Sequence, residues 1–340
     1  MGGSRHEWME PGAFEVAAGV HRIPLPLPND GLRAVNVYAI ADGDALTLVD
    51  GGWALEESRD RLDRALRTLG AGLGDIRQFL VTHAHRDHYT QAIAVRREYG
   101  STVRLGEGER ATLRALRDPE HRSNRAQLAL LAECGAKPVL EAVRAASRSP
   151  RAGHFWEEPD EWIGETTDVG LPDRPLRALA TPGHTRGHLV FLDEAHGLMF
   201  AGDHVLPHIT PSIGFEQAPG PLPLRDYLDS LRLVRALPDM RLLPAHGPVT
   251  GSVHARVDEL LDHHDGRLAA SADVVERGAD TAYAAARGLT WTRRERALDD
   301  LDPYNQMLAV LETKAHLDVL VLQGRLRAEE IDGVRHYASA

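Results

Sequence analysis

Three histidines and an aspartate occupy six consecutive positions of this 340-residue chain, in the stretch HAHRDH: His83, His85, Asp87 and His88. Imidazoles packed this closely would repel one another on protonation, which would cost stability in a folded protein. A divalent cation removes that cost, because neutral imidazole nitrogens and a carboxylate can share its charge as ligands. The loop therefore predicts a metal site.

Three later pieces of the sequence offer ligands of the same kind. They are TPGHTRGH with His184, FAGDH with Asp203 and LPAHGP with His246, and each follows a short apolar run. Loops at the ends of strands can direct polar side chains to a common rim of a sheet, so we expect these residues to meet the HAHRDH loop.

The seven residues divide into ligand sets for two divalent ions. One ion would be bound by His83, His85 and His184, with a solvent molecule in the fourth position. The second would be bound by Asp87, His88 and His246, and Asp203 could bridge the two ions. Imidazole and carboxylate ligands without a thiolate suit Zn²⁺ first, with Fe or Mn as alternatives.

The elements that must position these residues can be predicted from hydrophobic periodicity and turn signals. Strands are predicted at 19–28, 34–43, 45–52, 76–82, 176–183, 187–197, 198–203 and 240–247, and helices at 54–72, 89–100 and 108–150. This order favours an α/β domain with sheets inside and helices outside. No glycine-rich phosphate-binding loop follows a predicted strand, which argues against nucleotide binding.

The motifs H-x-H-x-D-H, T-P-G-H-T, G-D and P-A-H-G, at these intervals, resemble the metallo-β-lactamase-fold hydrolase superfamily over roughly residues 15–250. The resemblance implies a four-layered αββα sandwich with a dinuclear metal site at one edge of the sheets. The chain departs from the family pattern at Thr90-Gln91, where a small pair, often Gly-Gly, usually stands. The resemblance therefore supports the metal site more strongly than any particular substrate.

The C-terminal segment resembles the winged-helix-like appendage of one subgroup of that superfamily, which includes endoribonucleases, thioesterases and unassigned bacterial hydrolases. An apolar helical face is predicted from Leu308, Leu311, Ala315, Val319 and Leu322, and GRLRAEEIDGVRHY is typical of a β-wing. We expect a catalytic domain at 1–265, with a helical insertion at about 108–150, and a winged-helix-like domain at 266–340. The second domain has ten Lys/Arg against twelve Asp/Glu, which argues against nucleic-acid binding and favours covering the site or dimerisation.

Five more residues are expected behind the ligands or in the pocket: Asp50, Tyr89, His188, His204 and His208. Asp50, in LVDGG, resembles the buried turn aspartate with which the family orients the ligand loop. His188 and His204 stand close to ligands in sequence and are expected to hydrogen-bond or pack behind them. Tyr89 either enters the pocket or packs in the core.

Two cations about 3.5–4 Å apart would hold a bridging solvent molecule and lower its pKa from ~15.7 to about 7, which gives a hydroxide nucleophile. Asp87 would orient this hydroxide and then pass a proton to the leaving group. No serine or cysteine nucleophile competes with this mechanism, because the sequence has no G-x-S-x-G motif and Cys134 has no motif around it.

Among the substrates that the resembling superfamily hydrolyses, we expect a thioester or a related ester or lactone. An endoribonuclease or phosphodiesterase is the alternative, and a non-catalytic metal-binding regulatory protein is a third hypothesis.

The composition and net charge limit the kinds of binding partner that we expect. The chain has 43% apolar and 26% charged residues and a net charge of −11, so we expect a globular protein with a small-molecule substrate and without nucleic-acid or membrane partners. Cys134 is the single cysteine, which excludes a disulfide within the chain and suits the cytoplasm. No apolar run approaches membrane-spanning length. The sequence is also compatible with a homodimer.

Overall fold

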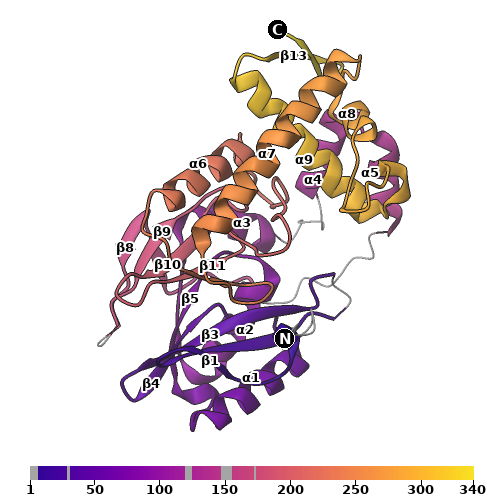
Figure 1. Cartoon of the computed structure of the whole chain (residues 1–340). Coiled ribbons are helices and arrows are strands. Elements are labelled where there is room, and N and C mark those ends of the chain that lie inside the picture. Colours follow the sequence, from indigo (N-terminus) through magenta and orange to yellow (C-terminus); the bar gives the residue numbers. More distant parts are fainter. Residues whose placement is uncertain (1–6, 29–30, 119–124, 147–154, 172–173) are drawn as a thin grey trace.

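The computed structural model describes residues 7–28, 31–118, 125–146, 155–171 and 174–340 (Figure 1). Figure 1 shows two sheets lying side by side, with helices on their outer faces and a helical lobe at the C-terminal end. The predicted insertion at about 108–150 falls partly outside the described residues, at 119–124 and 147–150.

The first sheet has seven strands that follow one another in chain order: β1 (Phe14–Ala17), β2 (Val20–Pro26), β3 (Ala34–Asp42), β4 (Ala45–Val49), β5 (Ile76–Val81), β6 (Thr102–Gly106) and β7 (Glu161–Ile163). Strands β1 to β4 are antiparallel neighbours. From β4 to β7 the neighbours are parallel. Parallel neighbours need crossover connections, and the helices that follow β4 and β5 supply two of them.

The second sheet has five strands in the order β12-β11-β10-β9-β8. Their bounds are β8 (Thr166–Asp168), β9 (Arg177–Ala180), β10 (Leu189–Asp193), β11 (Leu198–Gly202) and β12 (Arg241–Pro244). Strands β8 to β11 form an antiparallel meander, and β12 joins β11 in parallel.

Nine α-helices lie within the described part of the chain: α1 (Glu56–Thr68), α2 (Arg86–Tyr99), α3 (Arg110–Arg117), α4 (Arg125–Glu133), α5 (Lys137–Ala146), α6 (Pro223–Arg235), α7 (Val253–Glu276), α8 (Ala282–Gly288) and α9 (Pro303–Leu322). Short 3₁₀ turns are found at η1 (Glu7–Met9), η2 (Leu73–Asp75), η3 (Glu107–Glu109) and η4 (Leu298–Asp300). Within the described residues, each strand and helix predicted from the sequence is present, and its central residues fall inside the predicted range.

Three apolar cores establish the layers. The core between the sheets includes Tyr38, Leu80, Phe191, Phe200 and Leu243. The outer face of the first sheet packs on α1 and α2, with Phe79 and Val81 of β5 in that core. The outer face of the second sheet packs on α6 and α7.

Strand β5 shows why the strand sequences are apolar throughout. Leu80 points to one face of the sheet and its neighbours Phe79 and Val81 to the other, and both faces are covered. The result is the four-layered αββα sandwich.

The helical insertion packs with the C-terminal helices. Buried side chains of α4 and α5, such as Leu131 and Leu140, share one core with Leu311 and Leu317 of α9. Figure 1 shows α4 and α5 beside α8 and α9 in the C-terminal lobe. The Leu-rich stretch of the insertion is therefore packed helix.

After α7, helices α8 and α9 are followed by the hairpin of β13 (Leu326–Ile331) and β14 (Val334–Ser339). The predicted β-wing is thus an antiparallel hairpin. Helix α7 runs without interruption through residue 265, where the domain boundary was predicted. In α9, Leu311, Ala315 and Val319 are buried as predicted, but Leu322 is 55% exposed, because the helix ends there and leaves the core.

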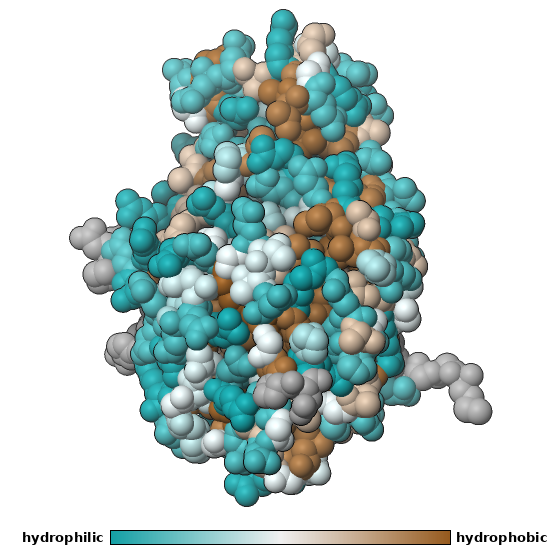
Figure 2. Space-filling model, turned by 90° about the vertical axis from the view of Figure 1, so that its left-hand side faces the viewer, coloured by the Kyte–Doolittle hydropathy of each residue, from teal (hydrophilic) through white to brown (hydrophobic). Residues whose placement is uncertain are grey.

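The surface of the face shown in Figure 2 is mostly hydrophilic, with hydrophobic side chains gathered in patches along its middle. In the described residues, no helix combines the length and the apolar character needed to cross a bilayer.

Candidate metal centre

The loops that follow β5, β9, β11 and β12 bring all seven predicted ligands into one cluster. Strand β5 ends at Val81, and the HAHRDH stretch turns directly into α2, which begins at Arg86. The loops after β9, β11 and β12 supply His184, Asp203 and His246. Their ligand atoms form two groups, and within each group all of these atoms lie within 4.8 Å of one another.

The first group has three imidazoles that point at a common centre. His85 Nδ1 lies 2.9 Å from His83 Nε2 and 3.2 Å from His184 Nε2. Asp203 closes the group, because its Oδ2 atom lies 3.5 Å from His184 Nε2 and 4.0 Å from His83 Nε2. Three nitrogens and one oxygen in this arrangement match the donor set of a four-coordinate transition-metal ion.

The second group shares Asp203 with the first. Asp87 Oδ2 lies 3.6 Å from His88 Nε2 and 3.5 Å from His246 Nε2. The other carboxylate oxygen of Asp203, Oδ1, lies 3.3 Å from His246 Nε2 and 3.7 Å from His88 Nε2. One oxygen of Asp203 thus faces each group, which is the placement required of a bridging ligand.

Three donor atoms of the cluster are buried and have no hydrogen-bond partner: His88 Nε2, His246 Nε2 and Asp203 Oδ1. An unpaired polar atom in a protein interior is expensive, so native structures almost always satisfy it. All three atoms face the centre of the second group, where a cation would accept their lone pairs. The residues therefore fit divalent metal ions.

The charges of the cluster lead to the same conclusion. Burial lowers the pKa of His83 far below its usual range, and burial together with His184 lowers the pKa of His85 to about 3. These imidazoles are neutral donors. Burial also opposes a charge on His88, but Asp50, Asp87 and Asp203 outweigh it and raise the pKa of His88 to about 10. The carboxylates thus attract a cation into this site.

The ligand histidines are held from behind by hydrogen bonds to their second ring nitrogen. His184 Nδ1 donates to Ser212 O at 2.8 Å, and His246 Nδ1 donates to Ala34 O at 2.8 Å. His83 Nδ1 donates to the Thr82 hydroxyl at 3.0 Å. These bonds fix the tautomer that leaves Nε2 free to bind a metal.

Asp50 lies behind His88. Its Oδ2 atom is 2.8 Å from His88 Nδ1, and its Oδ1 atom accepts the backbone N–H of Thr82 at 2.8 Å. Asp50 itself is buried and has a φ of 61°, a left-handed conformation that aspartate tolerates better than most residues. Asp50 is therefore bonded to two residues of the ligand loop, Thr82 and His88.

His188 holds Asp203 in place. Its Nδ1 atom donates to the Thr181 hydroxyl at 3.0 Å, and its Nε2 atom accepts the backbone N–H of Asp203 at 3.1 Å. The preceding residue is Gly202, with a φ of 50°, where a Cβ would lie 2.8 Å from His188 Nε2. Only glycine fits this close approach.

Of the other three predicted residues, Tyr89 and His204 pack against aromatic rings, and His208 is exposed. The Tyr89 hydroxyl donates to Glu157 O at 2.7 Å, and its ring stacks on Trp156, so Tyr89 packs in the core. His204 is buried and packs edge-on against Tyr227, with ring centroids 5.3 Å apart. His208 is exposed, and its role in the pocket stays a prediction.

Two polar residues of β3 that the sequence reasoning did not select also build the site. Asn36 Nδ2 donates to Pro244 O at 3.0 Å and to Gly247 O at 2.8 Å, on both sides of His246. The Tyr38 hydroxyl donates to Pro244 O at 2.8 Å. The available signal was the single amide in the otherwise apolar run AVNVYAIA.

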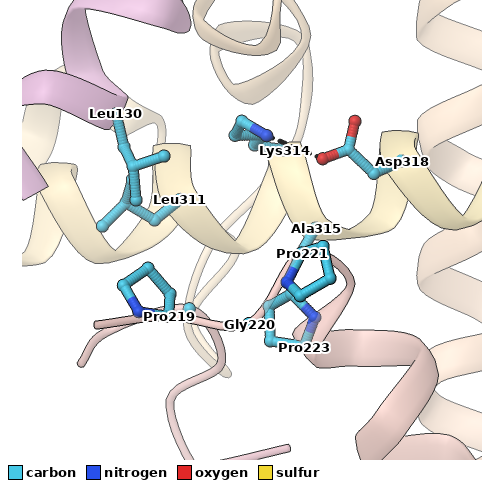
Figure 3. A pocket seen from close by; sticks show the side chains of 10 residues that line it. Leu130, Pro219, Gly220, Pro221, Pro223, Leu311, Lys314, Ala315 and Asp318 are labelled. Atoms are coloured by element: carbon cyan, nitrogen blue, oxygen red, sulfur yellow. Dashed lines mark hydrogen bonds and ion pairs between the residues drawn. The ribbon is translucent and has the colours of Figure 1, made fainter. Parts of the chain in front are cut away.

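A separate pocket, shown in Figure 3, lies between α9 and the proline-rich loop before α6. Its volume of about 40 Å³ is far below the ~300 Å³ of typical ligand pockets. Its charged side chains, Lys314 and Asp318, bind each other at 2.7 Å. The candidate functional site is the His/Asp cluster, where the seven potential metal ligands converge.

A sequence model of the metallo-beta-lactamase superfamily matches residues 30–246. The chain belongs to this superfamily. A second finding agrees: the protein named Probable metallo-hydrolase YqjP from Bacillus subtilis is 29% identical over 313 residues, covering 88% of this chain and 90% of that protein. The lactamase-like protein nscB of Trichophyton rubrum is 37% identical over 272 residues, covering 78% of this chain and 66% of that relative.

Solved structures of the superfamily share the fold over nearly the whole chain. The metallo-beta-lactamase family protein TTHA1429 of Thermus thermophilus has a TM-score of 0.77 and 25% identity, covering 96% of this chain and 100% of that one. A beta-lactamase domain protein of Burkholderia ambifaria has a TM-score of 0.78 and 26% identity, covering 96% and 94%. The chain is a metal-dependent hydrolase of the metallo-beta-lactamase superfamily, with a His/Asp cluster compatible with a dinuclear metal site.

Proposed function

We propose that this hydrolase binds two divalent metal ions and cleaves a thioester or a related carboxylic ester or lactone. The observation that carries the two-ion part is Asp203, whose Oδ2 and Oδ1 atoms face different histidine groups. A carboxylate in this position can bind one ion with each oxygen. Zn²⁺ is the first choice because all ligands are imidazoles and carboxylates, and Fe or Mn would accept the same set.

When bound, the two ions would activate a solvent molecule as nucleophile and polarise the carbonyl of the substrate. The chain's own residues then have separate tasks. Asp87 lies at the edge of the second group, where its carboxylate can orient the nucleophile and afterwards carry a proton to the leaving group. His188 and Asp50 keep Asp203 and His88 in place through the hydrogen bonds described above.

Substrate is proposed to enter on the side of His85 and Asp87, because these are the ligands that are only half-buried. Arg86, between them in sequence, is exposed, and its guanidinium lies 4.2 Å from the ring centroid of Trp53. A cation at the entrance suits an anionic substrate, such as an acyl thioester whose carrier bears phosphate groups. The resemblance of the C-terminal segment to the appendage found in thioesterases supports the same class.

A nucleic-acid substrate is the alternative within the same fold. It is disfavoured by the net charge of −11 and by the acidic side chains of the C-terminal hairpin, Glu329, Glu330 and Asp332, all of which are exposed. We therefore propose that the protein acts on small molecules in the cytoplasm and does not bind RNA or DNA.

The decisive experiment measures turnover by the metal-loaded protein on acyl-CoA esters, lactones, a chromogenic β-lactam and bis-p-nitrophenyl phosphate. Asp87→Asn serves as the inactive control, and exposed Asp229→Asn as the matched neutral one. Acyl-CoA or lactone hydrolysis that is lost in the first variant would support the proposal. Dominant phosphodiester cleavage, with salt-sensitive RNA binding in mobility shifts, would favour the nuclease. Full metal loading without turnover on any substrate would favour the regulatory protein.

A further inference from the structure

The 3₁₀ turn before α3 packs backbone against backbone on the loop that carries His184. A Cβ on Gly187 would lie 2.3 Å from Glu109 N, and a Cβ on Gly106 would lie 2.0 Å from Gly187 O. Both glycines are therefore required by the close approach of the two segments. The contact brings the side chain of Glu109 beneath the metal-binding loops.

Glu109 is fully buried and accepts hydrogen bonds from both ligand loops of the first group. The Thr185 hydroxyl, next to His184, donates to Glu109 Oε1. The same carboxyl accepts the backbone N–H groups of Ala84, which stands between His83 and His85, and of Gly187. Each of the three histidines is thus the sequence neighbour of a residue bound to this one carboxyl.

We propose that Glu109 is a positioning residue that fixes His83, His85 and His184 relative to one another and so sets the metal affinity of the first group. The inference rests on the two-ion site proposed above. It does not extend to His88 and His246, because Ala84 and Thr185, which are bonded to Glu109, adjoin neither of these two ligands. A defect at Glu109 should therefore weaken the two metal sites unequally.

A second buried carboxyl supports Glu109 from the other side. The Thr112 hydroxyl donates to Glu216 Oε2 at 3.1 Å and also faces Glu109. Burial raises the pKa of both carboxyls, and the proximity of Glu109 raises that of Glu216 further. Glu109 Oε2 is itself buried without a hydrogen-bond partner.

The pair also connects the metal loops to the helical lobe. Gln127 of α4 donates through Nε2 to Glu216 O at 2.8 Å, and the Arg186 backbone N–H lies 3.3 Å from Glu216 Oε2. The metal loops, the turn before α3 and helix α4 therefore meet at these two glutamates.

The test is a Zn²⁺ titration of metal-free wild type, Glu109→Ala and Glu109→Gln against a chromophoric chelator, with Co²⁺ absorption spectra as a report on ligand geometry. Glu107→Ala is the matched control, because Glu107 is an exposed acid in the same turn. We expect Glu109→Ala to weaken one ion by at least about 10-fold, as for other residues behind metal ligands, and to shift the Co²⁺ spectrum. Glu109→Gln should recover much of the affinity, because its amide oxygen can accept the same N–H groups.

Wild-type affinity and spectrum in Glu109→Ala would overturn the inference, and so would equal weakening of both ions, which indicates general destabilisation. If Glu109→Ala does not fold, Thr185→Val removes only the hydroxyl donor and must then weaken the same single ion. Wild-type protein that binds fewer than two ions would instead refute the two-ion site itself.

Discussion

Replacing Asp203 by asparagine should remove the link between the two metal sites while preserving the shape of the side chain. In the native protein, burial opposes the charge of Asp203, but His246, His88 and His184 hold its pKa below the usual range, so it is a carboxylate. Its two oxygens lie 3.3 Å from His246 Nε2 and 3.5 Å from His184 Nε2. In the variant, each of the two proposed ions would therefore lose a charged ligand.

The magnitude follows from this double role. Changes one layer behind a metal ligand cost roughly 10–100-fold in affinity, so loss of a direct ligand should cost at least that for each ion. Over two ions this amounts to about 3–6 kcal/mol, at about 1.4 kcal/mol for each factor of ten. Chelator competition and elemental analysis of Asp203→Asn, with Asp229→Asn as the exposed control, measure it. Retention of both ions at wild-type affinity would show that Asp203 is only a turn residue.

Three further predictions concern residues around the site and in the helical lobe. Asparagine tolerates the left-handed backbone at position 50, so Asp50→Asn should change only the charge behind His88. We expect metal binding at His88 to weaken by roughly 10–100-fold in the chelator competition. Tyr89→Phe loses one hydrogen bond of the core, so urea unfolding should show about 1 kcal/mol lower stability with unchanged metal content. Burial lowers the pKa of His316, which faces His264 at 3.1 Å, to about 4. The unfolded chain therefore binds more protons than the folded one between about pH 6.5 and 4, and stability is lost as the pH falls through this window. His316→Gln should reduce the difference in unfolding free energy between pH 7 and pH 5, whereas an unchanged difference would contradict this assignment.

The ligand set and the strands that carry it could be predicted because each is encoded locally. The motifs around His83, His184, Asp203 and His246 follow apolar runs that are buried on both faces, which gives a strong signal. Strands β7 and β8, with three residues each, carry no usable periodicity and were not predicted individually. Their pairing depends on neighbours that are distant in sequence.

The supporting residues could not be predicted for a similar reason. Glu109 lies in a stretch, GEGERATLRAL, that has the pattern of an ordinary exposed helix start, and its burial depends on contact with Gly187, far along the chain. The packing of α4 and α5 onto α9 is equally non-local. Helical periodicity identified these helices but gave no information about their partner.

The most direct test of the account is anomalous diffraction from crystals of the metal-loaded protein, recorded at the absorption edge of the metal. We predict two peaks, one bonded to His83, His85 and His184 and the other to Asp87, His88 and His246, with one oxygen of Asp203 bonded to each. A single peak, or two peaks with Asp203 bonded to neither, would contradict the account.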